Sequence, residues 1–371
     1  MAGIYVHIPF CARRCIYCGF FSTMREAEAA LYVNAVCREL ELRKDYLDGA
    51  PVNTLYFGGG TPSRLTPDQL GSIITAIDSA FGLTHLEELT VECNPDDVTP
   101  AYISALKELG VNRISMGVQT FNDDLLRFLG RRHTAKQAVD AVRICRETGI
   151  SNISIDLMYG LPGQTPQVQQ HDLETATILD VQHISSYCLS YEEGSPLERM
   201  RDESRLTPVD DDTCAQMFGR LCSHLRNAGF NHYEISNFCK PGYHSRHNSS
   251  YWDGTPYLGL GAGAHSYNGL SRQWSPSNLD TYMNSVEQAH PAFEKETLSE
   301  TDRFNEKVML SLRTSQGLNL FMLSPSDRLS VLNSAQPFIG IGELILKENY
   351  LSIPESAMFI SDTIISALFK D

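Results

Sequence analysis

Short apolar runs alternate with longer amphipathic stretches over the first two thirds of the chain. The apolar runs are rich in β-branched residues and predict six strands, at Ile4–Ile8, Thr54–Gly58, Leu89–Cys93, Arg113–Val118, Asn152–Tyr159 and His183–Leu189. The stretches between them predict helices, among them Ala27–Tyr46, Pro67–Phe81, Pro100–Leu109, Ala135–Thr148 and Thr165–Leu179. Thr precedes Pro67 and Pro100, and Gly110 and Gly149 stand just beyond two helices, which are usual start and stop signals.

This alternation of strands and helices predicts an α/β fold. Successive strand–helix units require parallel pairing with right-handed crossovers, so we predict a partial (βα)6 barrel similar to a TIM barrel. In such a barrel the chemistry lies at the C-terminal ends of the strands. After the barrel, at 1–230, we expect an irregular connection at 231–296, rich in Gly, Ser, Asn, Tyr and His near its start. A helical pattern resumes at Asp302–Thr314 and predicts a small, mainly helical C-terminal domain at 297–371.

Composition and charge exclude some classes of protein. The chain has 371 residues, of which 42% are hydrophobic and 20% charged, as in ordinary globular proteins. It contains no run approaching the roughly 20 apolar residues that span a bilayer. Its net charge of −15 argues against binding to nucleic acid, because phosphate binding needs clustered Lys and Arg. Met1 stands so close to the first predicted strand that we expect no leader, and therefore a cytoplasmic protein.

Three of the ten cysteines fall in the segment CARRCIYC, directly after the first predicted strand: Cys11, Cys15 and Cys18. Thiolates at this spacing on one loop can reach three corners of a 4Fe–4S cluster and leave its fourth iron open. Zinc is the competing metal, but structural zinc takes four ligands, usually as two separated pairs, and no second such pair follows. The loop therefore predicts a 4Fe–4S cluster, with zinc as the alternative.

Polar residues stand at the ends of the other predicted strands. The glycine run GGGTP at 58–62 permits a close backbone approach to a ligand but lacks the Lys of a phosphate-binding Walker loop. Glu92 lies in the third strand, Gln119 ends the fourth and is followed by Arg131, and Asp156 lies in the fifth. One such acid is explained equally well as a hydrogen-bonded structural residue. Several at successive strand ends favour a ligand, because an unpartnered buried charge costs several kcal/mol.

The cysteine spacing resembles that of the radical S-adenosylmethionine (SAM) superfamily. The segments YVHIPFCARRCIYC, YFGGGTPSRL, ECNPDD, RISMGVQTFN and SIDLMYGLPGQT resemble the oxygen-independent coproporphyrinogen III oxidase family, and within it the haem chaperone branch, the HemW proteins. The resemblance covers essentially the whole chain. It implies a radical SAM core over 1–230, with SAM on the open iron. The SAM-contacting positions that it implies are Tyr5, Gly60, Thr61, Glu92, Gln119, Arg131 and Asp156.

Two departures separate the chain from the oxidases of that family. The oxidases carry a further cysteine two residues beyond the third cluster cysteine, where this chain has Phe20. They also have an extended N-terminal arm, whereas only ten residues precede Cys11 here. These departures put coproporphyrinogen decarboxylation in doubt and leave the cluster assignment unaffected.

The segment HNSSYW, at 247–252, resembles the HNxxYW haem motif of the chaperone branch. It implies haem binding through His247, Tyr251 and Trp252, because an imidazole can ligate iron and aromatic rings offer flat faces to a porphyrin. His244 or His265 could replace His247 as the iron ligand. The structural alternative is an ordinary His–Asn turn followed by a packed Tyr–Trp pair.

The leading hypothesis is a haem chaperone that carries a SAM-ligated cluster and delivers haem to acceptor proteins. Membrane respiratory proteins are candidate acceptors, and a homodimer is a candidate assembly. The cluster and SAM then regulate haem transfer or oligomerisation. The first alternative is a radical SAM enzyme that acts on a tetrapyrrole, by decarboxylation or haem modification. The second is a scaffold that keeps the cluster for structure alone, against which the cofactor positions on four other strands argue.

Overall fold

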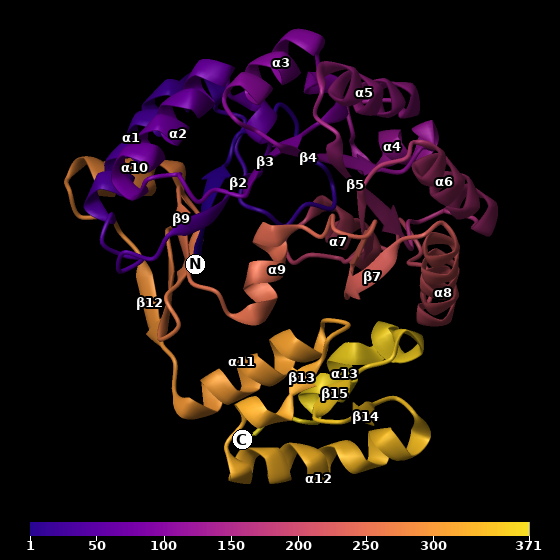
Figure 1. Ribbon diagram of the computed structural model, residues 1–371. Helices are drawn as coiled ribbons and strands as arrows, with labels where there is room; N and C mark the ends of the chain where they lie inside the picture. The colour runs from indigo at the N-terminus through magenta and orange to yellow at the C-terminus, as the bar shows by residue number, and fades with distance from the viewer. Residues whose placement is uncertain (371) are drawn as a thin grey trace.

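A computed structural model describes residues 1–370 and has a twelve-stranded sheet at its centre. The six middle strands pair in parallel and in chain order, and they curl into an open barrel (Figure 1). They are β1 (Ala2–Ile8), β2 (Val52–Gly59), β3 (Glu88–Cys93), β4 (Arg113–Gln119), β5 (Asn152–Tyr159) and β6 (His183–Cys188). Each matches a strand predicted from the sequence, so the α/β fold with a partial (βα)6 barrel is confirmed.

Helices form an outer ring around the arc of parallel strands (Figure 1). They are α1 (Ala29–Leu42), α2 (Pro67–Phe81), α3 (Pro100–Glu108), α4 (Asp123–Leu129), α5 (Ala135–Thr148), α6 (Pro166–Ile178) and α8 (Asp211–Asn227). Thr66 and Thr134 cap α2 and α5 by accepting the N–H of the residue three positions on. The inward faces, such as Leu70, Ile73 and Ile77 of α2, are buried against the sheet. The apolar face of each helix therefore sets its place on the barrel.

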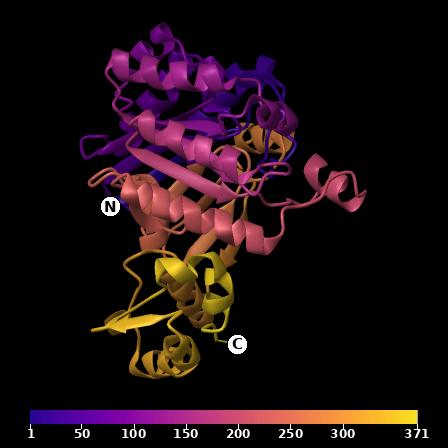
Figure 2. The same ribbon diagram turned by 90° about the vertical axis from the view of Figure 1, so that its right-hand side faces the viewer.

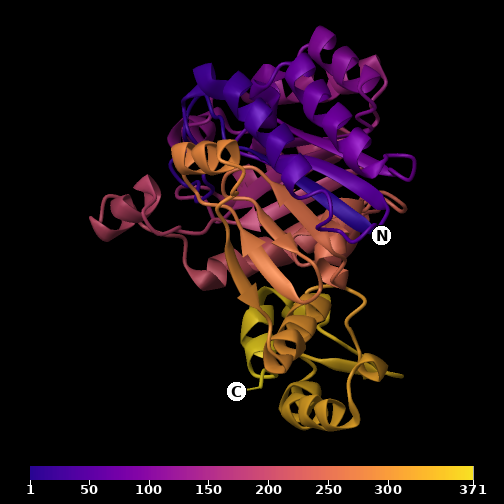
Figure 3. The same cartoon turned by 90° about the vertical axis from the view of Figure 1, so that its left-hand side faces the viewer.

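The prediction of an irregular connection over 231–296 is wrong, because much of this region extends the sheet. Beyond β6 lie β8 (Asn237–Cys239) and β7 (Asn231–Glu234); beyond β1 lie β9 (Tyr257–Leu260), β10 (His265–Tyr267), β11 (Ser271–Trp274) and β12 (Glu294–Thr297). β9 pairs in parallel with β1, and the strands beyond it are antiparallel (Figure 3). Strands of three or four residues are too short to display an alternating pattern. The helices of the region are α9 (Arg246–Asp253) and α10 (Leu279–Glu287).

The C-terminal elements form a lobe beside the open barrel (Figure 2). Its helices are α11 (Glu300–Leu312), α12 (Pro325–Ile341) and α13 (Ser361–Ser366), so the predicted helical character is confirmed. A separate sheet, in the order β13 (Leu318–Asn319), β15 (Tyr350–Ser352), β14 (Ile345–Lys347), was not predicted. The domain boundaries at 230 and 296 stay a prediction. Within residues 1–370, no helix combines the length and apolar character that a bilayer crossing requires.

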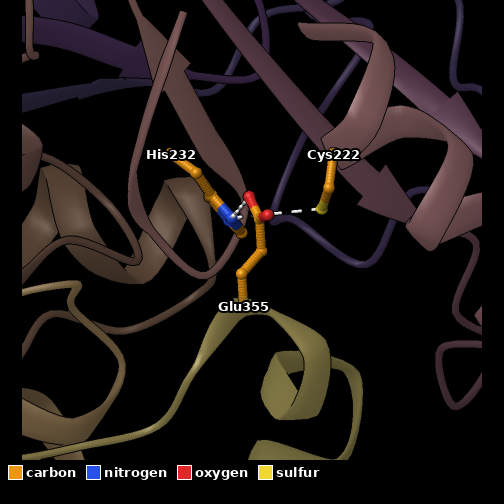
Figure 4. A group of neighbouring side chains, drawn as sticks. All are labelled: Cys222, His232 and Glu355. Atoms are coloured by element: carbon orange, nitrogen blue, oxygen red, sulfur yellow. Dashed lines mark hydrogen bonds and ion pairs between the residues drawn. The ribbon is translucent and has the colours of Figure 1, made fainter. Parts of the chain in front are cut away.

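One polar contact ties the lobe to the edge of the barrel. Glu355 opens the short helix η5 (Glu355–Ile360) and pairs with Arg226 of α8. One of its carboxylate oxygens lies 3.1 Å from Nδ1 of His232 in β7 (Figure 4). Cys222 of α8 lies beside them, with its Sγ 4.0 Å from the same nitrogen. Burial lowers the pKa of His232 to about 4, so its ring is neutral at pH 7. With His232 neutral, the Arg226–Glu355 ion pair is the charged part of this contact between the lobe and the barrel.

Candidate functional site

The cysteine loop follows the C-terminal end of β1 and is anchored on both sides. The N–H of Cys11 donates to the Thr23 carbonyl (2.9 Å), and the N–H of Ile16 donates to the Leu129 carbonyl (3.2 Å). The N–H of Leu197 donates in turn to the Ile16 carbonyl (3.0 Å). Beneath the loop lies a small apolar cluster, separate from the main core, formed by Leu125, Leu129, Met158, Leu161, Leu189 and Leu197. The loop thus has a packed support of its own.

Two of the three sulfur atoms have a polar neighbour from another part of the barrel. Cys11 Sγ lies 3.3 Å from Thr61 Oγ1, and Arg131 donates to Cys15 Sγ across 3.5 Å. Three thiolates are one ligand short of a tetrahedral zinc site, whereas a cubane cluster can be held by three thiolates with its fourth iron open. The donor set of the loop therefore fits a 4Fe–4S cluster better than zinc.

Arg131 is fixed beside the loop by the end of β4. Its guanidinium donates to Asn94 Oδ1 (2.6 Å) and to the Gly117 carbonyl (2.5 Å). A Cβ on Gly117 would lie 3.1 Å from Arg131 Nη2 and 2.9 Å from Gln119 Nε2, so a larger residue there would displace the ends of both side chains. Gln119 has φ of +70° at a bulge in β4, which turns it toward Arg131. Arg131 and Gln119 were predicted from the sequence, whereas the roles of Asn94 and Gly117 were not.

The glycine run brings the end of β2 against the end of β1. The Gly60 N–H donates to the Ile8 carbonyl (2.9 Å), and the Gly59 N–H donates to Glu92 Oε2 (3.3 Å). A Cβ on Gly59 would lie 2.6 Å from the His7 ring, and φ there is +115°. A Cβ on Gly60 would lie 2.8 Å from the Pro9 carbonyl carbon. Glycine is required at both positions because the two backbones approach so closely, and this approach sets Thr61 beside Cys11.

Glu92 and Asp156 lie on neighbouring parts of the barrel, on β3 and β5, and both are partly buried. Glu92 Oε1 accepts a hydrogen bond from the Tyr56 hydroxyl (2.7 Å), and Asp156 stands in register with Ser185 of β6. Burial, and to a lesser extent the nearby Asp156 charge, raise the pKa of Glu92 to about 7. Burial also raises the pKa of Asp156 to about 6, partly offset by a hydrogen bond from Ser185. A polar ligand would give these two carboxyl groups a further partner.

Arg113, at the start of β4, is a buried cation that the sequence analysis did not single out. It is 1% exposed, and its Nε and Nη1 have no hydrogen-bond partner within residues 1–370. Its charge lowers the pKa of both Glu92 and Asp156. An arginine that opens an otherwise apolar strand was the available signal, but Arg at a strand end more commonly faces solvent. Arg113 therefore balances part of the negative charge of Glu92 and Asp156.

The histidine of the HNSSYW segment is enclosed within the barrel. His247 is 1% exposed, with Nδ1 2.9 Å from Thr54 Oγ1 and Nε2 2.9 Å from the Tyr251 hydroxyl. Its ring stacks on Tyr56 at 5.0 Å, and Tyr56 stacks on Tyr5 at 6.1 Å. Burial lowers the pKa of His247 to about 3, so the ring is neutral. Both ring nitrogens are engaged inside the protein, and in this arrangement neither offers a lone pair to iron.

Helix α9, which carries this segment, lies at the opposite end of the strands from the cysteine loop. A Cβ on Gly3 would lie 3.2 Å from the His247 ring, and the Glu88 carboxylate accepts the N–H groups of Arg246 (2.9 Å) and His247 (3.0 Å). Gly3, Thr54 and Glu88 all belong to the N-terminal halves of their strands. The structure therefore places Thr61 and Arg131 against the cysteines. His247 lies toward the other end of the strands, where its ring stacks on Tyr5, one of the implied SAM positions, with centroids 6.4 Å apart.

The remaining residues proposed for haem are dispersed. Trp252 lines a groove between α9 and the C-terminal lobe, away from the His247 ring. His244 lies near Tyr233, with ring centroids 6.2 Å apart, and His265 stacks on Trp274 at 6.0 Å. Neither histidine joins His247 or Trp252 in a common site.

A barrel with a three-cysteine loop at the C-terminal end of its first strand defines a radical SAM protein, and the radical SAM superfamily is matched over residues 5–174. The haem chaperone HemW of Lactococcus lactis is 36% identical over 315 residues, covering 85% of this chain and 82% of its own. HemW of Mycobacterium tuberculosis is 32% identical over 372 residues, covering 99% and 94%. The chain belongs to the HemW family.

The barrel and lobe are also similar to a solved structure. Coproporphyrinogen III oxidase (HemN) from Escherichia coli, a radical SAM enzyme, matches with a TM-score of 0.86 over 100% of this chain and 90% of its own, at 23% identity. This likeness shows a common fold. Membership of the radical SAM superfamily implies a 4Fe–4S cluster and SAM.

Proposed function

We propose that this protein is a haem chaperone, which binds haem and transfers it to acceptor proteins. The observation that carries the proposal is the relationship to proteins named haem chaperones, which extends over 99% of this chain in one case. Phe20 supports it, because this residue is 69% exposed at the position where the oxidases of the wider family carry a further cysteine. A site lacking that cysteine is suited to holding a cluster without porphyrin decarboxylation.

We further propose that Cys11, Cys15 and Cys18 ligate the 4Fe–4S cluster. When bound, the cluster supplies an open iron for the amino and carboxylate groups of SAM and a one-electron reductant beside its sulfonium. Arg131 donates to Cys15 and so offsets thiolate charge. Glu92 and Asp156 then offer acceptors to the amine and ribose hydroxyls of SAM. The remaining SAM contacts in this proposal are Tyr5, Gly60, Thr61 and Gln119.

The proposal extends to acceptors, assembly and compartment. Membrane respiratory proteins are the proposed haem acceptors, and a homodimer is the proposed assembly. The cytoplasm is the proposed compartment, because all ten cysteines are free and free thiols are typical of reducing compartments. Here SAM and the cluster regulate transfer of haem to the acceptor.

The test is a titration of anaerobically reconstituted protein with haemin, followed by incubation with SAM and dithionite. We expect a saturable Soret shift and recovery of unmodified haem. The absence of a Soret shift would overturn the proposal.

The alternative is a radical SAM enzyme that acts on a tetrapyrrole, and it would give a different outcome in the same incubation. Coproporphyrinogen III or haem would then be converted in step with the release of 5′-deoxyadenosine. Stoichiometric vinyl products from coproporphyrinogen III would establish the oxidase, and a modified haem would establish the haem-modifying enzyme. We expect neither product.

A further inference from the structure

Three potential metal ligands meet where the C-terminal lobe touches the edge of the barrel (Figure 4). They are the Cys222 thiol of α8, the His232 imidazole of β7 and the Glu355 carboxylate of η5. Their donor atoms all lie within 4.8 Å of one another. Two elements of the barrel region and one of the lobe thus direct side chains of metal-binding type toward a single point.

The spacing of these donor atoms is close to that of a tetrahedral transition-metal site. Cys222 Sγ lies 4.0 Å from His232 Nδ1, and this nitrogen lies 3.1 Å from Glu355 Oε1. Zinc bonds of about 2.3 Å to sulfur, about 2.0 Å to nitrogen and about 2.1 Å to oxygen place such atoms about 3.4–3.6 Å apart. Side-chain shifts on the order of half an ångström would therefore bring all three donors onto one ion.

The His232 ring is held in a fixed orientation. Phe238 stacks on it with ring centroids 4.1 Å apart and an interplanar angle of 15°, and Phe218 meets it edge-on at 6.0 Å. Nε2 lies 3.3 Å from the Ile235 carbonyl, on the side away from Cys222 and Glu355. Histidines that ligate metals commonly donate their second ring N–H to a backbone carbonyl in this way, which leaves the other nitrogen free for the ion.

Oxygen acceptors face both nitrogens of this ring. Glu355 Oε1 faces Nδ1 and the Ile235 carbonyl faces Nε2, whereas a neutral imidazole carries a single N–H. In either tautomer one ring nitrogen therefore presents its lone pair to an oxygen. A cation bound at Nδ1 removes this conflict, because it accepts the nitrogen lone pair and attracts the carboxylate.

The two oxygens of the Glu355 carboxylate have different neighbours. Oε2 pairs with Arg226 of α8, whereas Oε1 faces His232. Arg226 thus orients the carboxylate for coordination through one oxygen, although its charge also lowers the affinity for a cation. The Glu355 side chain is 27% exposed and that of His232 is 9% exposed, so solvent reaches this point from the Glu355 side. A water molecule can therefore complete a tetrahedral ligand set.

We propose that Cys222, His232 and Glu355 bind a divalent transition metal of the zinc class, with water as fourth ligand, and that this ion joins the lobe to the barrel. Mixed sulfur, nitrogen and oxygen donors favour zinc over magnesium and calcium, which take oxygen ligands. Binding replaces the S–H bond of Cys222 with a sulfur–metal bond and releases the proton to solvent, while His232 contributes a lone pair. This site lies outside the proposed function and does not depend on haem binding.

The test is a titration with Co²⁺, a spectroscopic substitute for zinc, of the full chain carrying Cys11→Ser, Cys15→Ser and Cys18→Ser. These substitutions remove the loop thiols, so neither a cluster nor cobalt in the loop contributes absorption. We expect one equivalent of Co²⁺ to bind with a sulfur-to-cobalt charge-transfer band and the visible bands of four-coordinate cobalt. Adding Cys222→Ser should remove the charge-transfer band, whereas Cys37→Ser, at a half-buried cysteine of α1, should leave it.

Glu355→Gln tests the lobe side of the site at a partly exposed position. It should weaken Co²⁺ binding about tenfold or more, whereas Glu348→Gln, at an exposed acid elsewhere in the lobe, should leave the Kd unchanged. In the cluster-containing wild type, Zn²⁺ should slow amide hydrogen exchange in η5 and β7. A charge-transfer band that is absent, or that survives Cys222→Ser, would overturn the site, as would an unchanged Kd in Glu355→Gln with native circular dichroism.

Discussion

Glu92 and Asp156 are the residues whose protonation responds most directly to a ligand in the barrel. Burial holds the pKa of Glu92 at about 7, although the Tyr56 hydroxyl and the Gly59 N–H stabilise its charged form. A free glutamate titrates near 4.5, so between these two values the unfolded chain is ionised and the folded chain keeps its proton. Because the folded state then binds more protons, the unfolding free energy falls as the pH rises through this window.

We predict a pH-dependent stability that belongs to Glu92. Without added SAM, the unfolding free energy should fall between about pH 5.5 and about pH 7.5, and Glu92→Gln should remove about 2 kcal/mol of that fall. Urea unfolding followed by circular dichroism measures both slopes. Glu108→Gln, on the surface of α3, is the control and should keep the wild-type slope. Equal slopes in wild type and Glu92→Gln would show that Glu92 is ionised throughout this range.

Helix α9 divides the HNSSYW segment between two environments. His247 and Tyr251 are four residues apart, so they share the helix face that is buried against β2, whereas Trp252 is turned about 100° further around the axis and reaches the groove. The Glu88 carboxylate accepts the first two N–H groups of the helix and so fixes its N-terminus to β3. The orientation of the Trp252 side chain therefore depends on a helix cap that Glu88 of β3 supplies.

We predict that Glu88→Gln loosens α9 and moves Trp252. The amide offers one acceptor oxygen where the carboxylate offers two, so one buried N–H loses its partner, at a cost of about 1–3 kcal/mol. In a Trp274→Phe background Trp252 is the only tryptophan, and its emission should shift to longer wavelength. Glu41→Gln, an exposed change on α1, should leave the emission unchanged. Unaltered emission and stability in Glu88→Gln would contradict the cap.

At the scale of the whole molecule, the cofactor positions and the groove lie toward opposite ends of the barrel strands. The cysteine loop follows the C-terminal end of β1, whereas α9 contacts the N-terminal halves of β1 to β3. Between them stand Glu92, Tyr56 and His247, joined by the Tyr56–Glu92 hydrogen bond and by ring stacking. A radical formed beside the cluster would have to cross this packed interior to reach a ligand held by α9.

We predict that haem binding survives loss of the cluster. The variant with Cys11→Ser, Cys15→Ser and Cys18→Ser should bind haemin within about threefold of the wild type, because the cysteine loop follows the C-terminal end of β1 whereas the HNSSYW segment lies at the N-terminal halves of the strands. Equilibrium dialysis with labelled SAM supplies the matched readout, and SAM binding should be lost in the same variant. A loss of haem binding in a variant with native circular dichroism would instead place the haem beside the cluster.

Much of the fold and of the cofactor site could be predicted from the sequence. The six central strands appear as apolar runs because both their faces are buried, and the cysteine loop appears because its three ligands are close in sequence. The flanking strands β7 to β12 were missed because three or four residues carry no measurable period. Arg113 was missed because its burial depends on packing that a strand end does not reveal.

By itself the sequence determined the barrel, the cluster loop and the family, since each is encoded by local spacing. The tertiary structure decided which way the HNSSYW side chains face. His247 meets Thr54 of β2, and the helix that carries it is capped by Glu88 of β3, partners 193 and 159 residues away in the chain. The groove likewise exists only where α9 and α11 meet. Contacts of that sequence separation are set by the packing of whole elements, which no local pattern contains.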